Sequence, residues 1–223
     1  MLLFAGDPHG RYRHLEDIAR SHRPAALVLL GDNEPPTPET LPILNRAAPV
    51  YYILGNHDTD REEALLNHEG LTGGDLNGRV REVAGVRIAG LAGVFREKIW
   101  HPAGEVQWAC RADLAARTPK HTRFRGGPPL RQWSSIWWED YAALQGETAD
   151  VLVSHEAPES HRHGFRAVGD LARALGVHTV FHGHHHEDYD GEIAGRRDGE
   201  RIRVRGVSDC GLCDLDGHRP ATG

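Results

Sequence analysis

Short apolar runs that end at glycine are the sequence feature that most constrains how this chain can fold. The first three runs are Leu2–Gly6, Ala25–Gly31 and Val50–Gly55, and continuous apolar runs of this length are typical of strands buried on both faces. Between them, Tyr12–Arg23 places apolar residues at helical spacing, and Glu39–Ala48 follows a proline-rich break. This β-α-β-α-β order predicts an α/β fold with a mainly parallel sheet and right-handed crossovers.

The second half of the chain continues this alternation. Further strands are predicted at Val86–Gly93, Asp150–Ser154 and Val177–Phe181, with a helix at Val168–Leu175 before the last of them. The late stretch Arg201–Val207 alternates polar and apolar residues, which is typical of an antiparallel edge strand or hairpin with one wet face.

Length and composition fit one globular domain. The chain has 223 residues, of which 39% are apolar, enough for one substantial core. The apolar start lacks a basic region, and no apolar run approaches the roughly 18 residues that span a bilayer. Three cysteines, Cys110, Cys210 and Cys213, are too few for a disulfide framework. We therefore expect a cytoplasmic protein with reduced cysteines.

One segment differs in composition from the rest of the chain. All five tryptophans lie between residues 100 and 138. The stretch Arg111–Arg131 contains six Lys or Arg against the single acid Asp113, which gives it a net charge of +5 within a chain of net charge −6. We expect residues 97–146 to form an insertion or cap inside a single 1–223 domain. It could cover a site with arginine and tryptophan, or be a packed helical subdomain, and the helical spacing over Gln132–Gln145 favours packing.

Residues of the types that bind metals follow the predicted strands. Histidine, the commonest metal ligand, makes up 16 of the 223 residues. The motifs at the strand ends are Gly6-Asp7-Pro8-His9-Gly10, Gly31-Asp32-Asn33, Gly55-Asn56-His57-Asp58, Ser154-His155-Glu156 and His182-Gly183-His184-His185-His186. The motifs around Asp7 and Asp32 alone also fit ordinary turn chemistry, whereas His184-His185-His186 by itself already indicates a metal. Together they indicate a metal site, because the carboxyl ends of parallel strands meet at one edge of a sheet.

The ordered set DxHG, GD, GNHD, an isolated His and GHxH resembles the calcineurin-like metallophosphoesterases. The resemblance runs from residue 6 to residue 186. It implies a four-layer sandwich of two mixed β-sheets flanked by helices, with a dinuclear metal site at the strand ends. The implied ligands are Asp7, His9 and His186 for one metal, Asn56, His155 and His184 for the other, and Asp32 as the bridge between them. His57 would stand beside the metals, oriented by Asp58.

The same resemblance implies a reaction. Two divalent cations lower the pKa of a bridging water from about 15.7 toward neutrality and orient the ester for in-line attack by the bridging hydroxide. His57 would then act as a general acid on the leaving oxygen. Mixed oxygen and nitrogen ligands without a thiolate favour Mn²⁺, with Fe, Zn or Ni as alternatives. We therefore expect a hydrolase of a phosphodiester or a nucleotide.

Departures from the family pattern bear on the substrate. The second motif lacks the Asp-Arg-Gly continuation of the protein phosphatase branch, and the third ends in Asp58 instead of Glu. These departures disfavour a protein phosphatase and favour a phosphodiesterase. A broad phosphomonoesterase or a protein-phosphatase-like activity is kept as the alternative. Single-stranded nucleic acid is a second substrate candidate, and a non-catalytic interaction scaffold is disfavoured because all seven implied ligands and His57 are present. Arg96 and Trp100, which follow the predicted strand Val86–Gly93, are the candidate substrate contacts.

Overall fold

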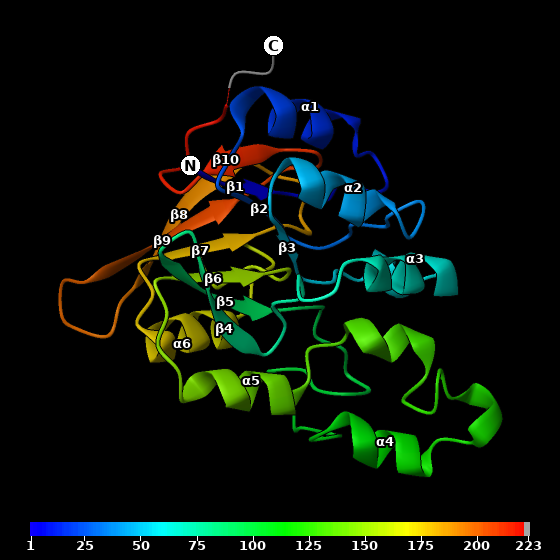
Figure 1. Cartoon of the computed structure of the whole chain (residues 1–223). Helices are drawn as coiled ribbons and strands as arrows, with labels where there is room; N and C mark the ends of the chain where they lie inside the picture. The colour runs from blue at the N-terminus through cyan, green and yellow to red at the C-terminus, as the bar shows by residue number, and fades with distance from the viewer. Residues whose placement is uncertain (221–223) are drawn as a thin grey trace.

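Two mixed β-sheets form the centre of the protein, shown as a computed structural model that describes residues 1–220 (Figure 1). The first sheet has the order β10 (Leu212–Asp214), β1 (Leu2–Ala5), β2 (Ala26–Leu29), β3 (Val50–Tyr52). Strands β1, β2 and β3 are parallel, and β10 pairs with β1 in the antiparallel sense. The three apolar runs at the start of the chain therefore form neighbouring parallel strands, as predicted.

The second sheet has the order β4 (Arg79–Val83), β5 (Val86–Leu91), β6 (Val151–Ser154), β7 (Thr179–His182), β9 (Arg201–Gly206), β8 (Tyr189–Ala194). Its four central strands are parallel, and the edge strands β4 and β8 are antiparallel to their neighbours. The alternating stretch near residue 201 is β9, the second strand of a hairpin with β8. Its other edge pairs with β7, so β9 is internal to the sheet.

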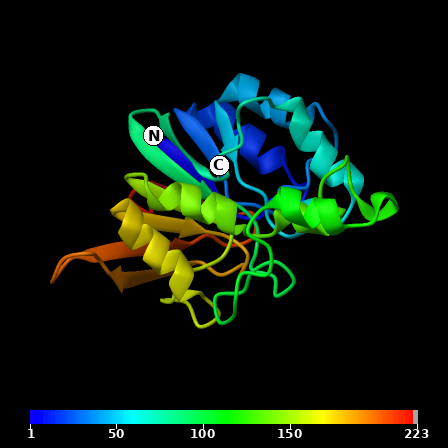
Figure 2. The ribbon, with the colours of Figure 1, turned by 90° about the horizontal axis from the view of Figure 1, so that it is seen from below.

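Helices cover the outer face of each sheet, which gives four layers. Helices α1 (Arg13–His22) and α2 (Thr40–Ala47) pack on the first sheet, and α5 (Trp138–Gln145) and α6 (Arg166–Leu175) pack on the second. Figures 1 and 2 show the two pairs on opposite sides of the sheets. Helix α6 ends at Gly176, whose left-handed φ of 71° suits a residue without a Cβ. The predicted four-layer sandwich is confirmed.

The inner faces of the two sheets pack directly against each other. Phe4 of β1 stacks on Phe181 of β7 with ring centroids 3.8 Å apart. Both side chains are fully buried, as are Val28 and Val153 from neighbouring strands. Burial of apolar area at about 25 cal/mol per Å² makes this contact a main source of stability. It also holds the ends of β1, β2, β6 and β7 in fixed relation, which positions the site described below.

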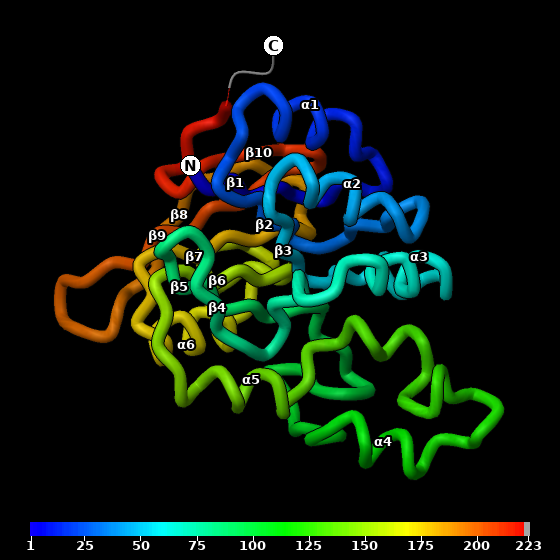
Figure 3. Tube along the Cα trace, in the orientation of Figure 1, coloured from blue at the N-terminus to red at the C-terminus, as the bar shows by residue number. Residues whose placement is uncertain are grey.

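The segment between β5 and α5, residues 92–137, extends out of the sandwich and is called the excursion. This excursion carries α4 (Arg111–Arg117) and the 3₁₀ turns Lys120–Thr122 and Leu130–Ser134. In Figure 3 it lies below α3 (Glu62–Leu66) and away from the sheets. Among residues 1–220, no helix is both long enough and apolar enough to cross a membrane.

The helix predicted over Gln132–Gln145 begins only at Trp138. Ser135 is extended and bridges to Val94, and the amide of Ile136 donates to the carbonyl of Val94. This pairing with a distant segment keeps the chain extended up to Trp137. Ile136, Trp137 and Tyr141 are buried, as their spacing indicates. Only Trp138–Gln145 is α-helical, because residues 132–134 belong to a 3₁₀ turn and residues 135–137 lie outside both helices.

Candidate metal centre

Loops at the carboxyl ends of five strands bring the predicted ligands together. These strands are β1, β2, β3, β6 and β7, and in Figure 1 the arrowheads of β6 and β7 point toward the side where α3 lies. Parallel strands direct their carboxyl ends to the same edge, so residues more than a hundred positions apart in sequence become neighbours. The site is built from loops that a rigid pair of sheets holds in place.

One cluster consists of His9, Asp32 and His186. Their potential ligand atoms all lie within 4.8 Å of one another. The Nε2 atoms of His9 and His186 face each other at 3.3 Å. The Nδ1 atom of His9 lies 2.9 Å from Oε2 of Glu34, so Nδ1 can carry the proton while Nε2 keeps its lone pair. This is how an outer carboxylate usually orients a ligating imidazole.

A second cluster consists of Asp32, His155 and His184, again within 4.8 Å of one another. His155 is fully buried, and its Nδ1 atom donates to the carbonyl of Leu30 at 2.8 Å. Its Nε2 atom therefore points inward, 3.3 Å from both Oδ2 of Asp32 and Oδ1 of Asn56. Asp32 belongs to both clusters, which is the position of a bridging carboxylate.

Asp7 lies beside the second cluster instead of within the first. Its carboxylate accepts the backbone N–H of His184 at 2.9 Å, and its Oδ1 atom is 3.7 Å from Nδ1 of His155. The resemblance groups Asp7 with His9 and His186. Two residues separated by one position, as Asp7 and His9 are, would share a face if the backbone between them were extended. Both residues are instead left-handed, with φ of 39° and 45°, so the loop turns between them.

Backbone geometry at the strand ends is unusual. Five of the seven predicted ligands have positive φ, namely Asp7, His9, Asp32, His184 and His186. Such conformations are uncommon for residues other than glycine, and they are concentrated at functional sites. The left-handed backbone at His184 and His186 directs their side chains into different clusters. The lack of a side chain at Gly55 leaves space for two of the ligands, because a Cβ there would overlap the carboxylate of Asp32 and the ring of His155.

The donor set fits divalent cations. Imidazole nitrogens and carboxylate oxygens that converge within 4.8 Å of one another are donor types that bind divalent transition cations. Burial alone would lower the pKa of His155, but the charges of Asp32 and Asp7 raise it to about 10. Desolvation also opposes ionisation of Asp32, yet His155 and the amide of His57 hold its pKa low. The carboxylates of Asp32 and Asp7 therefore favour a positive charge at His155, whereas burial and the charge of His155 lower the pKa of its neighbour His184 to about 3.

His57 stands at the edge of both clusters and is half-exposed. Its ring centroid is 5.5 Å from that of His9, and its backbone N–H donates to Oδ1 of Asp32 at 2.7 Å. Its Nδ1 atom lies 2.7 Å from Oδ2 of Asp60. Burial lowers the pKa of His57, but the hydrogen bond with Asp60 and the charge of Asp32 outweigh it, so the pKa is raised.

The prediction that Asp58 orients His57 is wrong. Asp58 is fully buried and accepts the backbone N–H groups of Glu34 at 2.7 Å and of Gly55 at 2.8 Å. The residues His57–Thr59 form a 3₁₀ turn, and three residues per turn place positions 57 and 60 on the same side. Asp58 therefore points into the protein and ties two loops of the site together.

Arg96 reaches the rim of the site from the loop after β5. It is half-buried, and its Nη2 atom donates to Oγ of Ser134 at 3.3 Å. Its Nε atom is buried and has no acceptor among the described residues. Desolvation and the nearby Arg131 lower the pKa of Arg96, whereas Asp60, Glu156 and Asp32 raise it. Arg96 therefore lies near charged residues of the centre, and its contact with substrate stays a prediction.

The structure contradicts the expected role of Trp100. Only 6% of its surface is exposed, and it packs edge-on against Phe95, Trp138 and Tyr141. The carbonyl of Trp100 accepts the amide of Arg96 in a short antiparallel bridge. The bridge turns the indole into the core beneath α5, so Trp100 supports the loop that carries Arg96 without facing substrate.

Sequence reasoning missed Glu34, Asp60, Ser134 and Glu156 as members of the site. Glu34 directly follows the motif Gly31-Asp32-Asn33, and Asp60 lies two residues beyond the motif that ends in Asp58. This proximity was the available signal. Oε1 of Glu156 accepts the amide of Phe95 at 3.2 Å. Ser134 comes from the excursion, and only the fold brings it to the site.

The chain matches the family described as calcineurin-like phosphoesterase over residues 1–188. A protein of Haemophilus influenzae, described as uncharacterized, is 40% identical over 191 residues, which cover 85% of this chain and 84% of that protein. Family membership over most of the chain is consistent with the motifs at the strand ends.

Solved structures with the same fold are also found. One crystal structure covers 98% of this chain and 96% of its own chain, with a TM-score of 0.56 and 14% sequence identity. A putative 5′-nucleotidase from Staphylococcus aureus, solved in complex with alpha-ketoglutarate, has a TM-score of 0.51 and 14% identity over 98% of this chain and 52% of that chain. At such low identity these matches show a shared fold alone.

Proposed function

This chain belongs to the calcineurin-like phosphoesterase family, and from that premise we propose that it hydrolyses phosphodiesters or nucleotides with two divalent cations. The single observation that carries the proposal is the position of Asp32, which belongs to both ligand clusters. One carboxylate shared by two sets of imidazoles supports a dinuclear centre. We propose Mn²⁺ as the activating ion, because the donor atoms are oxygen and nitrogen.

We assign the ligands from the contacts described above. His9 and His186 would hold one cation and Asn56, His155 and His184 the other, with Asp32 between them. Asp7 touches His155 and the amide of His184, and its assignment to the first cation rests on the family motif and not on these contacts. When bound, the cations would supply Lewis acidity toward phosphoryl oxygens and would acidify a water molecule.

Residues of the chain itself would handle the leaving group. His57, kept protonated to a higher pH by Asp60, is placed to donate a proton to the departing oxygen. The guanidinium of Arg96, with a buried N–H that lacks an acceptor among residues 1–220, is placed to bind a phosphoryl oxygen. The buried carboxylate of Asp58 would keep the loops in register without touching substrate.

The test is hydrolysis of bis-p-nitrophenyl phosphate by the purified full chain with added Mn²⁺. We expect turnover that falls at least about 100-fold in His57→Ala, with metal content retained, and that disappears in Asp32→Ala, with metal content lost. Metal is measured independently by elemental analysis, with about two ions per chain expected. A metal-loaded protein that hydrolyses no phosphodiester or phosphomonoester in a broad panel would contradict the proposal.

A phosphomonoesterase is the second candidate. The observation that favours it is the half-exposed position of His57 beside an open rim, which also accommodates a terminal phosphate. The ratio of kcat/KM for bis-p-nitrophenyl phosphate to that for p-nitrophenyl phosphate decides between the two. A ratio above one supports the diesterase, and a ratio well below one supports the monoesterase.

A further inference from the structure

A cavity of about 800 Å³ opens on the surface of the excursion. It lies between the turn at Glu97–Lys98, helix α4 and the 3₁₀ turn Leu130–Ser134. The side chains that determine its chemistry are Glu97, Lys98, Trp108, Leu114, Leu130 and Arg131. Its volume is in the range of pockets that enclose small organic ligands, roughly 300–1,000 Å³.

This cavity is joined to the metal centre through Arg131. The Arg131 side chain lines the cavity, and its Nη2 atom lies 3.2 Å from Oδ1 of Asp60. Asp60 in turn contacts His57, the proposed proton donor. On the other side, Lys98 follows two residues after Arg96, the proposed phosphate contact. Two successive side-chain contacts, Arg131 with Asp60 and Asp60 with His57, therefore connect a group in the cavity to the proposed proton donor.

The lining combines cationic, aromatic and apolar groups. Lys98 and Arg131 supply two positive charges against the one negative charge of Glu97. Trp108 is half-buried, and Arg117 covers its ring with the guanidinium carbon 5.4 Å from the centroid. Leu114 and Leu130 contribute apolar surface. Such a lining suits a planar organic group that carries a negative charge at one end.

We propose that this cavity binds the leaving group of the substrate, and that this leaving group is a nucleoside monophosphate. The planar base would pack among Trp108, Leu114 and Leu130, and the phosphate would face Lys98 and Arg131. In the reaction, a water oxygen forms a new bond to the scissile phosphorus. The bond from that phosphorus to the nucleotide oxygen breaks, and the departing oxygen keeps the electron pair and takes a proton. The assignment rests on the proposed function.

The test is the binding of adenosine 5′-monophosphate to the full chain, measured by isothermal titration calorimetry. Adenosine lacks the charge and ribose 5-phosphate lacks the base, so these two probes separate the two halves of the ligand. We expect the nucleotide to bind at least about tenfold more tightly than either probe. Equal affinity for the nucleotide and ribose 5-phosphate would show that only a phosphate is recognised, and it would overturn the proposal.

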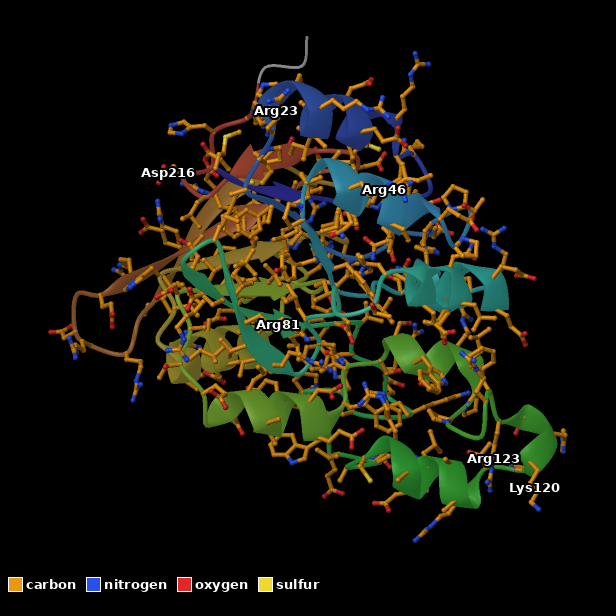
Figure 4. The ribbon with its side chains drawn as sticks, in the orientation of Figure 1. Arg23, Arg46, Arg81, Lys120, Arg123 and Asp216 are labelled. Carbon is orange, nitrogen blue, oxygen red and sulfur yellow. The ribbon has the colours of Figure 1, made fainter. Side chains whose placement is uncertain are left out.

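Two lysine variants locate the binding. Lys98→Gln removes a charge from the cavity, and Lys120→Gln removes the same charge from the far end of the excursion, where Figure 4 labels Lys120. Both side chains are exposed, so both variants should fold. We expect Lys98→Gln to weaken nucleotide binding about three- to tenfold and Lys120→Gln to leave it unchanged. Equal effects of the two variants would place the nucleotide elsewhere.

Failure of this inference is distinguishable from failure of the proposed reaction. Hydrolysis of bis-p-nitrophenyl phosphate by the wild type reports on the reaction, and nucleotide calorimetry reports on the cavity. If the wild type hydrolyses bis-p-nitrophenyl phosphate but does not bind the nucleotide as expected, only the assignment of the cavity is contradicted. If the nucleotide binds as expected but no turnover is seen, the cavity still binds a nucleotide, and the proposal that this nucleotide is a leaving group is contradicted.

Discussion

Asp60, and not its neighbour Asp58, holds the imidazole of His57, with 2.7 Å between Oδ2 of Asp60 and Nδ1 of His57. The other carboxylate oxygen of Asp60 lies 3.2 Å from the guanidinium of Arg131. Asp60 therefore connects the proposed proton donor to the excursion that carries Arg131. Asp58 and Asp60, which are separated by one residue in the sequence, have separate roles that can be measured.

Asp60→Asn should impair catalysis without harming the fold. The amide cannot stabilise the imidazolium of His57 as a carboxylate does, and it can favour the wrong tautomer. We expect kcat for bis-p-nitrophenyl phosphate to fall about 10- to 100-fold, with metal content and the urea midpoint unchanged. Asp17→Asn, an exposed aspartate of α1, is the matched control. A kcat equal to that of the wild type would show that Asp60 does not position His57.

Asp58→Ala should lower the free energy of unfolding. The change leaves the backbone N–H groups of Glu34 and Gly55 without their acceptor in a buried place. Each such group costs about 1–3 kcal/mol, so we expect a loss of roughly 3 kcal/mol in total. Urea unfolding followed by circular dichroism in the presence of chelator measures this directly. An unchanged unfolding midpoint would contradict the structural role.

Gly55→Ala should abolish metal binding. A Cβ at this position overlaps the carboxylate of Asp32 and the ring of His155, so the shared ligand of both clusters must move. We expect metal content to fall from about two ions per chain to below one, with loss of turnover. Gly146→Ala is the control, because a Cβ there meets no atom within 4 Å. Full metal content in Gly55→Ala would show that the loop adapts.

Stability should depend on His68 at mildly acidic pH. Desolvation lowers the pKa of this buried histidine to about 4, from an ordinary value of about 6.5. The unfolded chain therefore binds a proton that the folded chain does not between these two values. The contribution of neutral His68 to the free energy of unfolding is complete above pH about 6.5. It is lost as the pH falls toward 4, by up to about 1.4 kcal/mol per pH unit.

The variant His68→Gln should remove this part of the pH dependence. Nδ1 of His68 donates to the carbonyl of Ala64, and Nε2 lies 3.3 Å from the side-chain amide of Asn33, contacts that glutamine reproduces in part. We expect a shallower slope of unfolding free energy between pH 4 and 6.5, measured by urea denaturation with chelator. His22→Gln, at an exposed position of α1, should keep the wild-type slope.

Much of the fold followed from local patterns. The apolar runs at Leu2–Gly6, Ala25–Gly31 and Val50–Gly55 became β1, β2 and β3, because a strand buried on both faces requires apolar residues at every position. The same patterns located the ends of the strands, and so the places where polar ligands converge. Edge strands such as β4 and β8, with mixed burial, lack that signal, and the sequence did not reveal them.

The sequence by itself determined which residue types stand at the strand ends, because strand direction and parallel pairing carry those ends to one edge. Only the tertiary structure decided how they meet. A 3₁₀ turn directs Asp60 toward His57 and Asp58 into the interior, and a backbone bridge to Arg96 turns Trp100 into the core. The excursion likewise forms its cavity from residues that are distant in sequence. Such contacts depend on turn geometry and on packing between remote segments, which residue spacing does not encode.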